Sequence, residues 1–419
     1  NTTGNSNAAL GYQALEQNTT ASDNTGIGYF ALTDNTTGAR NAALGAAALG
    51  DNTTASDNTA VGARALRQNT TGAVNTAVGS YALDANTTAS YNTAVGHAAL
   101  KTNTTAASNT AVGYAAIHDN TTGDSNTAVG RQALEKNTTA GHNVAVGNQT
   151  LRFNTTGSYN VAVGNYALDA NTTGQANVAV GYAALSANTT GEVNSAFGHQ
   201  ALNDATTASY NTAMGYRAAY EITTGGYNVA IGTYALLDNT TSSSNTAVGY
   251  GALGNVTDSS NTAIGYHAGE QMIHGTNNIF IGNNAQGTAT DADHQITLGN
   301  SSNTVLRCQV TSITALSDER DKTDIIDLPL GIDFLNTIRP VKFTWKHREP
   351  VEGKDGTQKA GFIAQELDKA QKDAGVEDYM KLVLDDNPNK LEASAGHLLP
   401  VIVKAIQELS AKVAALEAG

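Results

Sequence analysis

The sequence repeats with a fixed period over about three quarters of its length, and this period constrains the fold more than any other feature. An Asn opens each unit at an even spacing, as at Asn7, Asn24 and Asn41, and so on to Asn245. The spacing of seventeen positions shortens once, to Asn261, and returns at Asn278. A unit this short cannot enclose a core alone, whereas stacked units bury a continuous one. The period therefore predicts a solenoid of about 17 coils.

Within each unit, the fourth residue is apolar and the fifth is Gly, as in Thr-Ala-Val-Gly. This alternation predicts a short β-strand whose second and fourth residues share one face. We expect that face to line the interior, which would place Val78, Val95 and Val112 in the core. A second short strand should hold the Ala-Leu pair, with Leu83 and Leu100 also in the core. Asn-Thr-Thr is typical of a turn.

Stacked coils bring equivalent residues together along one axis. We expect the opening Asn side chains to form a hydrogen-bonded ladder, as amides do in cross-β stacks. A charge inside such a ladder would be repeated or unpaired, so charges should be confined to turns, as at Asp34, Asp51 and Lys136. At about 4.8 Å per coil, the stack should span on the order of 80 Å.

Composition separates two regions. Residues 1–316 contain 9 Lys and Arg and 18 Asp and Glu, whereas residues 317–419 contain 14 and 19, as in an ordinary globular domain. The net charge of −14 argues against nucleic-acid binding. No apolar run approaches the ~20 residues of a membrane span, so we expect no membrane insertion. The scattered histidines form no close ligand pair, and we expect no metal and no cofactor. The chain begins at Asn1 inside a repeat-like NTTG, and we expect an attachment domain upstream.

The repeat resembles the head domains of trimeric autotransporter adhesins and repeat regions of phage tail fibres, through its Thr-Ala-Val-Gly strand. The resemblance covers roughly residues 1–290 and implies a parallel β-roll that assembles as a trimer. Tyr recurs at the sixth position of the unit, as at Tyr114, Tyr182 and Tyr250. We expect these rings to pack between coils, with glycan contact as the alternative.

The repeat pattern fades after Asn278, and residues 291–316 are predicted to form a strand-rich connector. Downstream come SDERDKTDI (317–325), RPVKFTWK (339–346) and AGFIAQEL (360–367), followed by a terminal helix. These motifs, in this order, resemble the intramolecular chaperone of endosialidases and related phage tail proteins, an autocleaving peptidase family. The resemblance implies that residues 317–419 form a chaperone and autocleavage domain.

The same resemblance assigns chemistry to two residues. Ser317 corresponds to the nucleophile that attacks the carbonyl of Leu316, and Lys322 corresponds to its base. Lysine acts as a base only when neutral, and burial favours that form. Asp318 and Asp321 oppose this by favouring the charged form. The alternative to a catalytic role is that Ser-Asp is the N-cap of a helix.

The C-terminal residues predict a coiled-coil helix over 400–417. Pro400 suits a first helical turn, and a 4-3-4-3 apolar seam follows it. The family resemblance implies that three such helices associate. The seam consists of Ile402, Ile406, Leu409, Val413 and Leu416.

Together these features predict a mostly β protein: a trimeric parallel β-solenoid shaft followed by a small α+β chaperone domain ending in a coiled-coil helix. The expected function is a homotrimeric, receptor-binding fibre or spike in a virion tail, which cleaves itself between Leu316 and Ser317 but turns over no external substrate. A host-surface glycan or protein is the expected receptor. The alternatives are a bacterial surface adhesin of the same architecture, a polysaccharide-degrading tailspike and an ice-binding protein with Thr rows.

Overall fold

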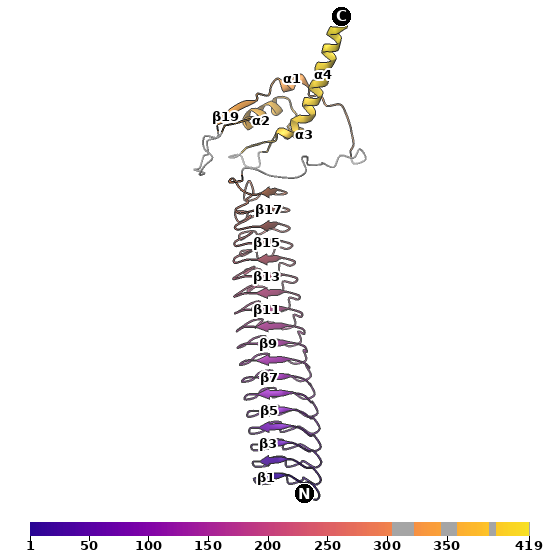
Figure 1. The fold of residues 1–419 in the computed structure, drawn as a ribbon, viewed down its shortest axis with the longest axis vertical. Coiled ribbons are helices and arrows are strands. Elements are labelled where there is room, and N and C mark those ends of the chain that lie inside the picture. The colour runs from indigo at the N-terminus through magenta and orange to yellow at the C-terminus, as the bar shows by residue number, and fades with distance from the viewer. Residues whose placement is uncertain (304–321, 345–357, 385–390, 419) are drawn as a thin grey trace. The chain divides into compact units, whose positions relative to one another are not determined.

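The computed structural model describes residues 1–303, 322–344, 358–384 and 391–418. The chain divides into two compact units, Asn1–Asn303 and Thr304–Gly419, and each is considered by itself. The first unit is a stack of coils in which every coil contributes one three-residue strand to a single parallel sheet (Figure 1). This arrangement is the predicted β-solenoid.

The sheet contains 18 strands, each paired with the strand of the next coil. The register advances by one full repeat unit at each step, as in Ala94 beside Ala111, and by one position less at the shortened unit, where Ala247 lies beside Ala263. The last strand belongs to a coil that Gln rather than Asn opens, so the stack continues through residues 296–298. The strands are β1 Ala8–Leu10, β2 Thr25–Ile27, β3 Ala42–Leu44, β4 Thr59–Val61, β5 Thr76–Val78, β6 Thr93–Val95, β7 Thr110–Val112, β8 Thr127–Val129, β9 Val144–Val146, β10 Val161–Val163, β11 Val178–Val180, β12 Ser195–Phe197, β13 Thr212–Met214, β14 Val229–Ile231, β15 Thr246–Val248, β16 Thr262–Ile264, β17 Ile279–Ile281 and β18 Ile296–Leu298.

Hydrogen bonds between coils continue beyond the strands into the turns. Thr110 N–H donates to Asn126 O at 2.8 Å within the sheet, and Ile117 N–H donates to Ala133 O at 2.9 Å in the turn. The expected second strand is wrong. The Ala-Leu pair lies in a tight turn, where Leu83 and Leu100 have φ of 53° and 49°. These left-handed residues bend the backbone sharply, which lets each coil close within a single repeat unit.

The expected interior face of the strand is also wrong. The middle residue of the strand points inward: Ala94 is fully buried, whereas Val95 is 36% exposed. Val78 and Val112 are only half-buried and, like Val95, lie on the outer face. Leu83 and Leu100 do lie in the interior, fully buried. In most coils two Asn side chains and this Leu are buried together with the inward strand residue, which is Ala.

Two buried Asn ladders run along the shaft. The opening Asn residues form the predicted one: Asn126 N–H donates to Asn109 Oδ1 at 2.8 Å, and its Nδ2 donates to Ala140 O at 2.9 Å. The second ladder uses the Asn of Asn-Thr-Thr and joins amide to amide. Asn120 Nδ2 donates to Asn103 Oδ1 at 2.9 Å, and the same bond recurs in the coils around it.

The second ladder loses its Asn after Asn188. Ala205 and Ile222 replace it in two successive coils, Asn239 restores it once, and Val256 and Met272 replace it in the next two. All four replacing residues are buried. At the two broken ends, Asn188 Oδ1 and Asn239 Nδ2 are buried without a hydrogen-bond partner among the described residues. The unmet groups identify what each ladder Asn provides: a donor to one neighbour and an acceptor to the other.

The second unit is a small α+β fold with its own core. The core joins residues from every helix and from the short strand pair, including Phe334, Leu367, Met380, Val383 and Val401. Its elements are α1 Ile332–Leu335, β19 Val341–Thr344, β20 Gln358–Gly361, α2 Ala364–Asp373, α3 Glu377–Met380, β21 Val383–Leu384, β22 Glu392–Ala393, the 3-10 helix Ala395–Leu398 and α4 Leu399–Glu417. Within the described parts of the chain, no helix combines the length and the apolar character that a membrane span requires.

The repeated Gly is tested by Gly113→Ala. Gly113 has φ +139°, and a Cβ there would lie 2.3 Å from Gly130 O in the next coil. We expect the free energy of unfolding to fall by at least about 2 kcal/mol per chain, because this backbone region is nearly exclusive to Gly. Thermal unfolding followed by circular dichroism measures the effect. Gly50→Ala is the control, since a Cβ there meets nothing closer than 3.5 Å; equal effects would contradict the explanation.

The amide ladder is tested by Asn120→Ala. The change leaves Asn103 Oδ1 without its donor and removes the acceptor that Asn137 Nδ2 uses at 2.8 Å. A buried polar group that loses its partner costs about 1–3 kcal/mol, so the unfolding midpoint should fall clearly. Thr122→Ala, at an exposed position of the same turn, should change it little. A midpoint unchanged in Asn120→Ala would show that the ladder contributes nothing to stability.

Candidate functional site

The predicted cleavage site is only partly visible. Leu316, Ser317, Asp318 and Asp321 lie outside the described residues. Lys322 is described: it lies in an irregular segment that leads to α1, and its side chain is exposed. The described residues of the single chain therefore leave Lys322 open to solvent.

The family motifs downstream are brought together in space. β19, from the Arg-Pro-Val motif, pairs antiparallel with β20, which leads into the Gly-Phe-Ile-Ala-Gln-Glu motif, with Val341 opposite Gly361. Arg339 Nε donates to Glu366 Oε2 at 3.0 Å, and a second bond joins Arg339 Nη2 to Oε1. This bidentate pair lowers the pKa of the Glu366 carboxyl from its usual value. The two motifs thus form one structural element, in which the Arg339–Glu366 pair links the strand pair to the first turn of α2.

The terminal helix uses only part of its surface within the chain. α4 has a Pro in its first turn, as predicted, and its buried residues are Val401 and Ala405. The five seam residues lie outside this contact: they are 40% exposed at Ile402, 61% at Ile406, 50% at Leu409, 45% at Val413 and 81% at Leu416. An apolar seam of this spacing is the surface by which coiled-coil helices associate.

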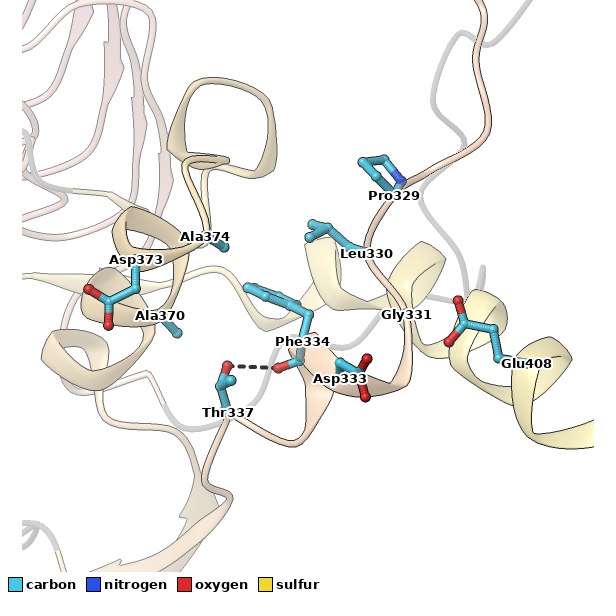
Figure 2. Close-up of a pocket in the computed structure, with 10 residues that line it drawn as sticks. All are labelled: Pro329, Leu330, Gly331, Asp333, Phe334, Thr337, Ala370, Asp373, Ala374 and Glu408. Carbon is cyan, nitrogen blue, oxygen red and sulfur yellow. Dashed lines mark hydrogen bonds between the residues drawn. The ribbon is translucent and has the colours of Figure 1, made fainter. Parts of the chain in front are cut away.

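A hollow of about 420 Å³ lies between α1, α2 and α4 (Figure 2). Glu408 from α4 reaches across to α1, where Ile332 N–H donates to its carboxylate at 2.9 Å. Thr337 donates its hydroxyl proton to Phe334 O at 2.7 Å, so this group is engaged locally. The described lining residues include no Ser, Lys, Cys or His. They therefore supply no serine–lysine pair, and Glu408 accepts a hydrogen bond at the start of α1.

Aromatic side chains of the shaft meet between coils, as expected for the sixth position. Tyr182 stacks on His199 with ring centroids 5.0 Å apart, and Tyr250 stacks on Tyr266 at 5.5 Å. A second row, at the end of each unit, contains His142 and Tyr159, 5.1 Å apart and tilted by 4°. Stacked rings cover part of one another's faces, so these side chains contribute to the contact between coils.

Two features of the site escape the sequence reasoning. The Arg339–Glu366 pair was missed because its members are far apart in sequence; the signal available was that each belongs to one of the family motifs. The outward row of Val and Ile along the sheet was assigned to the wrong side. Its signal was the Ala at the third position, which is small enough for a narrow interior.

Comparison with known protein families gives one match. Residues 317–376 match the family described as Chaperone of endosialidase, and the match begins at Ser317, the predicted nucleophile. Comparisons with curated proteins and with solved structures give no match. The chain thus combines a β-solenoid shaft with a chaperone-of-endosialidase domain at residues 317–376.

Proposed function

We propose that this protein is a homotrimeric, receptor-binding fibre or spike of a phage tail, whose C-terminal unit gathers three chains and then separates by cleavage between Leu316 and Ser317. The observation that carries the proposal is the exposed seam of α4. Ile406 and Leu416 are 61% and 81% exposed, although the helix already packs on its own unit through Val401 and Ala405. A solvated seam of this length needs partner helices, and a short helix is marginal without them.

Assembly before folding suits the shaft. Each strand pairs in parallel with a strand one repeat unit away, and parallel sheets are intrinsically slow to form. An incomplete stack also exposes unpaired strand edges. A C-terminal unit that aligns three chains in register would give all the shafts a common starting point. After its removal, the shafts would be held by their own contacts, and their persistence would depend on the rate of unfolding.

The exposure of Lys322 suggests how cleavage is delayed until assembly. A lysine base must be neutral, and desolvation favours the neutral form. Since the described residues of one chain leave Lys322 exposed, we propose that neighbouring chains supply the burial. In this mechanism the neutral amine of Lys322 takes the proton from the Ser317 hydroxyl, whose oxygen attacks the Leu316 carbonyl. The proton then goes to the departing Ser317 nitrogen, which leaves an ester between Leu316 and the Ser317 oxygen. Water hydrolyses this ester and separates the two parts of the chain.

The tail fibre role rests on the pairing of a long shaft with this chaperone domain. A bacterial surface adhesin with the same parts is the second candidate, favoured by the resemblance of the repeat to adhesin heads. In both cases a host-surface glycan or protein is the proposed receptor, and exposed tyrosines such as Tyr216 and Tyr227 are available to it.

The proposal is tested with the whole chain and three variants. The parent, of 43.1 kDa, should separate on denaturing gels into pieces of about 32 and 11 kDa. Ser317→Ala and Lys322→Ala should remain uncut, because each removes one member of the pair. Ser301→Ala, at an exposed serine of the shaft unit, should cleave as the parent does. Native mass spectrometry of Ser317→Ala should report three chains.

The two halves of the proposal fail separately. An uncut parent with the mass of three chains would contradict self-cleavage and leave the trimer. A Ser317→Ala particle containing one chain would contradict the trimer.

A further inference from the structure

The outward face of the shaft's sheet carries an unbroken row of apolar residues. In each strand the middle residue points inward, and the flanking residues point outward. The third strand residue is Val, Ile, Leu, Met or Phe in all 18 strands, and the first is Thr, Val, Ala, Ser or Ile. No outward strand residue is charged, although the turns of the same coils carry charges such as Arg64, Asp84 and Lys136.

The exposure of this face continues from one end of the shaft to the other. Leu10 is 70% exposed, Val163 37%, Met214 48% and Ile281 42%. With strands about 4.8 Å apart, the row extends for on the order of 80 Å. Soluble monomers rarely leave a continuous apolar surface of this length open to water, and larger patches mark interaction sites.

The geometry of the row specifies its partner. A partner surface that covers all the strands must repeat at the distance between successive strands. Otherwise its side chains lose their register with those of the shaft. A second copy of this chain, parallel and level with the first, has that spacing by construction. The absence of charge fits such an arrangement, because a charge on a symmetric interface faces its own copy. Val and Ile side chains are stiff at χ1 and lose little freedom when covered.

We infer that the outward strand residues form the interface between shafts, with the rows of different chains packed against one another along a common axis. This rests on the proposed homotrimer and names the face that the trimer uses. The row contains only Val from Val61 to Val180, and larger residues, among them Leu10, Phe197 and Met214, lie toward both ends. The shafts should therefore approach most closely over the Val segment.

The inference is tested by cross-linking the whole chain in solution. In a Cys308→Ser background, which removes the only native cysteine, Val163→Cys places a thiol on the proposed interface. Thr173→Cys places one at an exposed position of the Asn-Thr-Thr turn in the same coil.

Each protein is treated with a short bismaleimide and run on denaturing gels. Around a threefold axis a two-armed linker joins two chains and leaves the third, so Val163→Cys should give mostly covalent dimer with a remaining monomer band. Thr173→Cys should give monomer.

Native mass spectrometry of the same samples separates the outcomes. Trimers that cross-link at residue 163 and not at residue 173 support the inference. Trimers that cross-link at 173, or at neither position, contradict the assigned face and leave the trimer intact. A particle with one chain contradicts both the interface and the proposed function.

Discussion

The hydrogen-bonded stacking of coils in fixed register is the constraint on which this structure depends. Each residue lies beside its equivalent in the next coil, so a buried polar group at one position of the repeat meets the same position of the coils on either side. Asn meets this condition, since it offers a donor on one side and an acceptor on the other, as Asn120 does between Asn103 and Asn137. The interruption at Ala205 and Ile222 shows the reverse case, with unpaired amide atoms at Asn188 and Asn239.

The same constraint divides inside from outside. Alternation along a three-residue strand sends one side chain inward and two outward, and the coil is narrow enough that the inward one is Ala in nearly every strand. The larger apolar residues are thereby left on the surface. In the C-terminal unit, α4 likewise turns Val401 inward and leaves Ile402 and Ile406 exposed. Each unit, taken by itself, satisfies its core and presents a second apolar surface, which connects the fold to association between chains.

Much of this architecture follows from the sequence. The period gives the coils, the opening Asn gives one ladder, and the seam spacing gives the terminal helix. The side of the strand was predicted wrongly because alternation shows which residues share a face but not which face is inward. That choice depends on the interior width, which is set by Leu100 and by the Asn ladders together. The second ladder was read as turn chemistry, since Asn-Thr-Thr is suited to both. For the proposed cleavage pair, the sequence supplies Ser317 and Lys322. The burial that the proposed mechanism requires of Lys322 would come from other chains, which the sequence of one copy does not place.

The central claim is that a single period stacks each chain into coils and turns one apolar row toward other copies. A cryo-electron microscopy reconstruction of the purified protein tests this most directly, because it resolves the coil spacing, the number of chains and the direction of the strand side chains. The account predicts three parallel shafts with coils about 4.8 Å apart and the Val61–Val180 row facing the shared axis. A shaft made of one chain, with this row open to solvent, would contradict it.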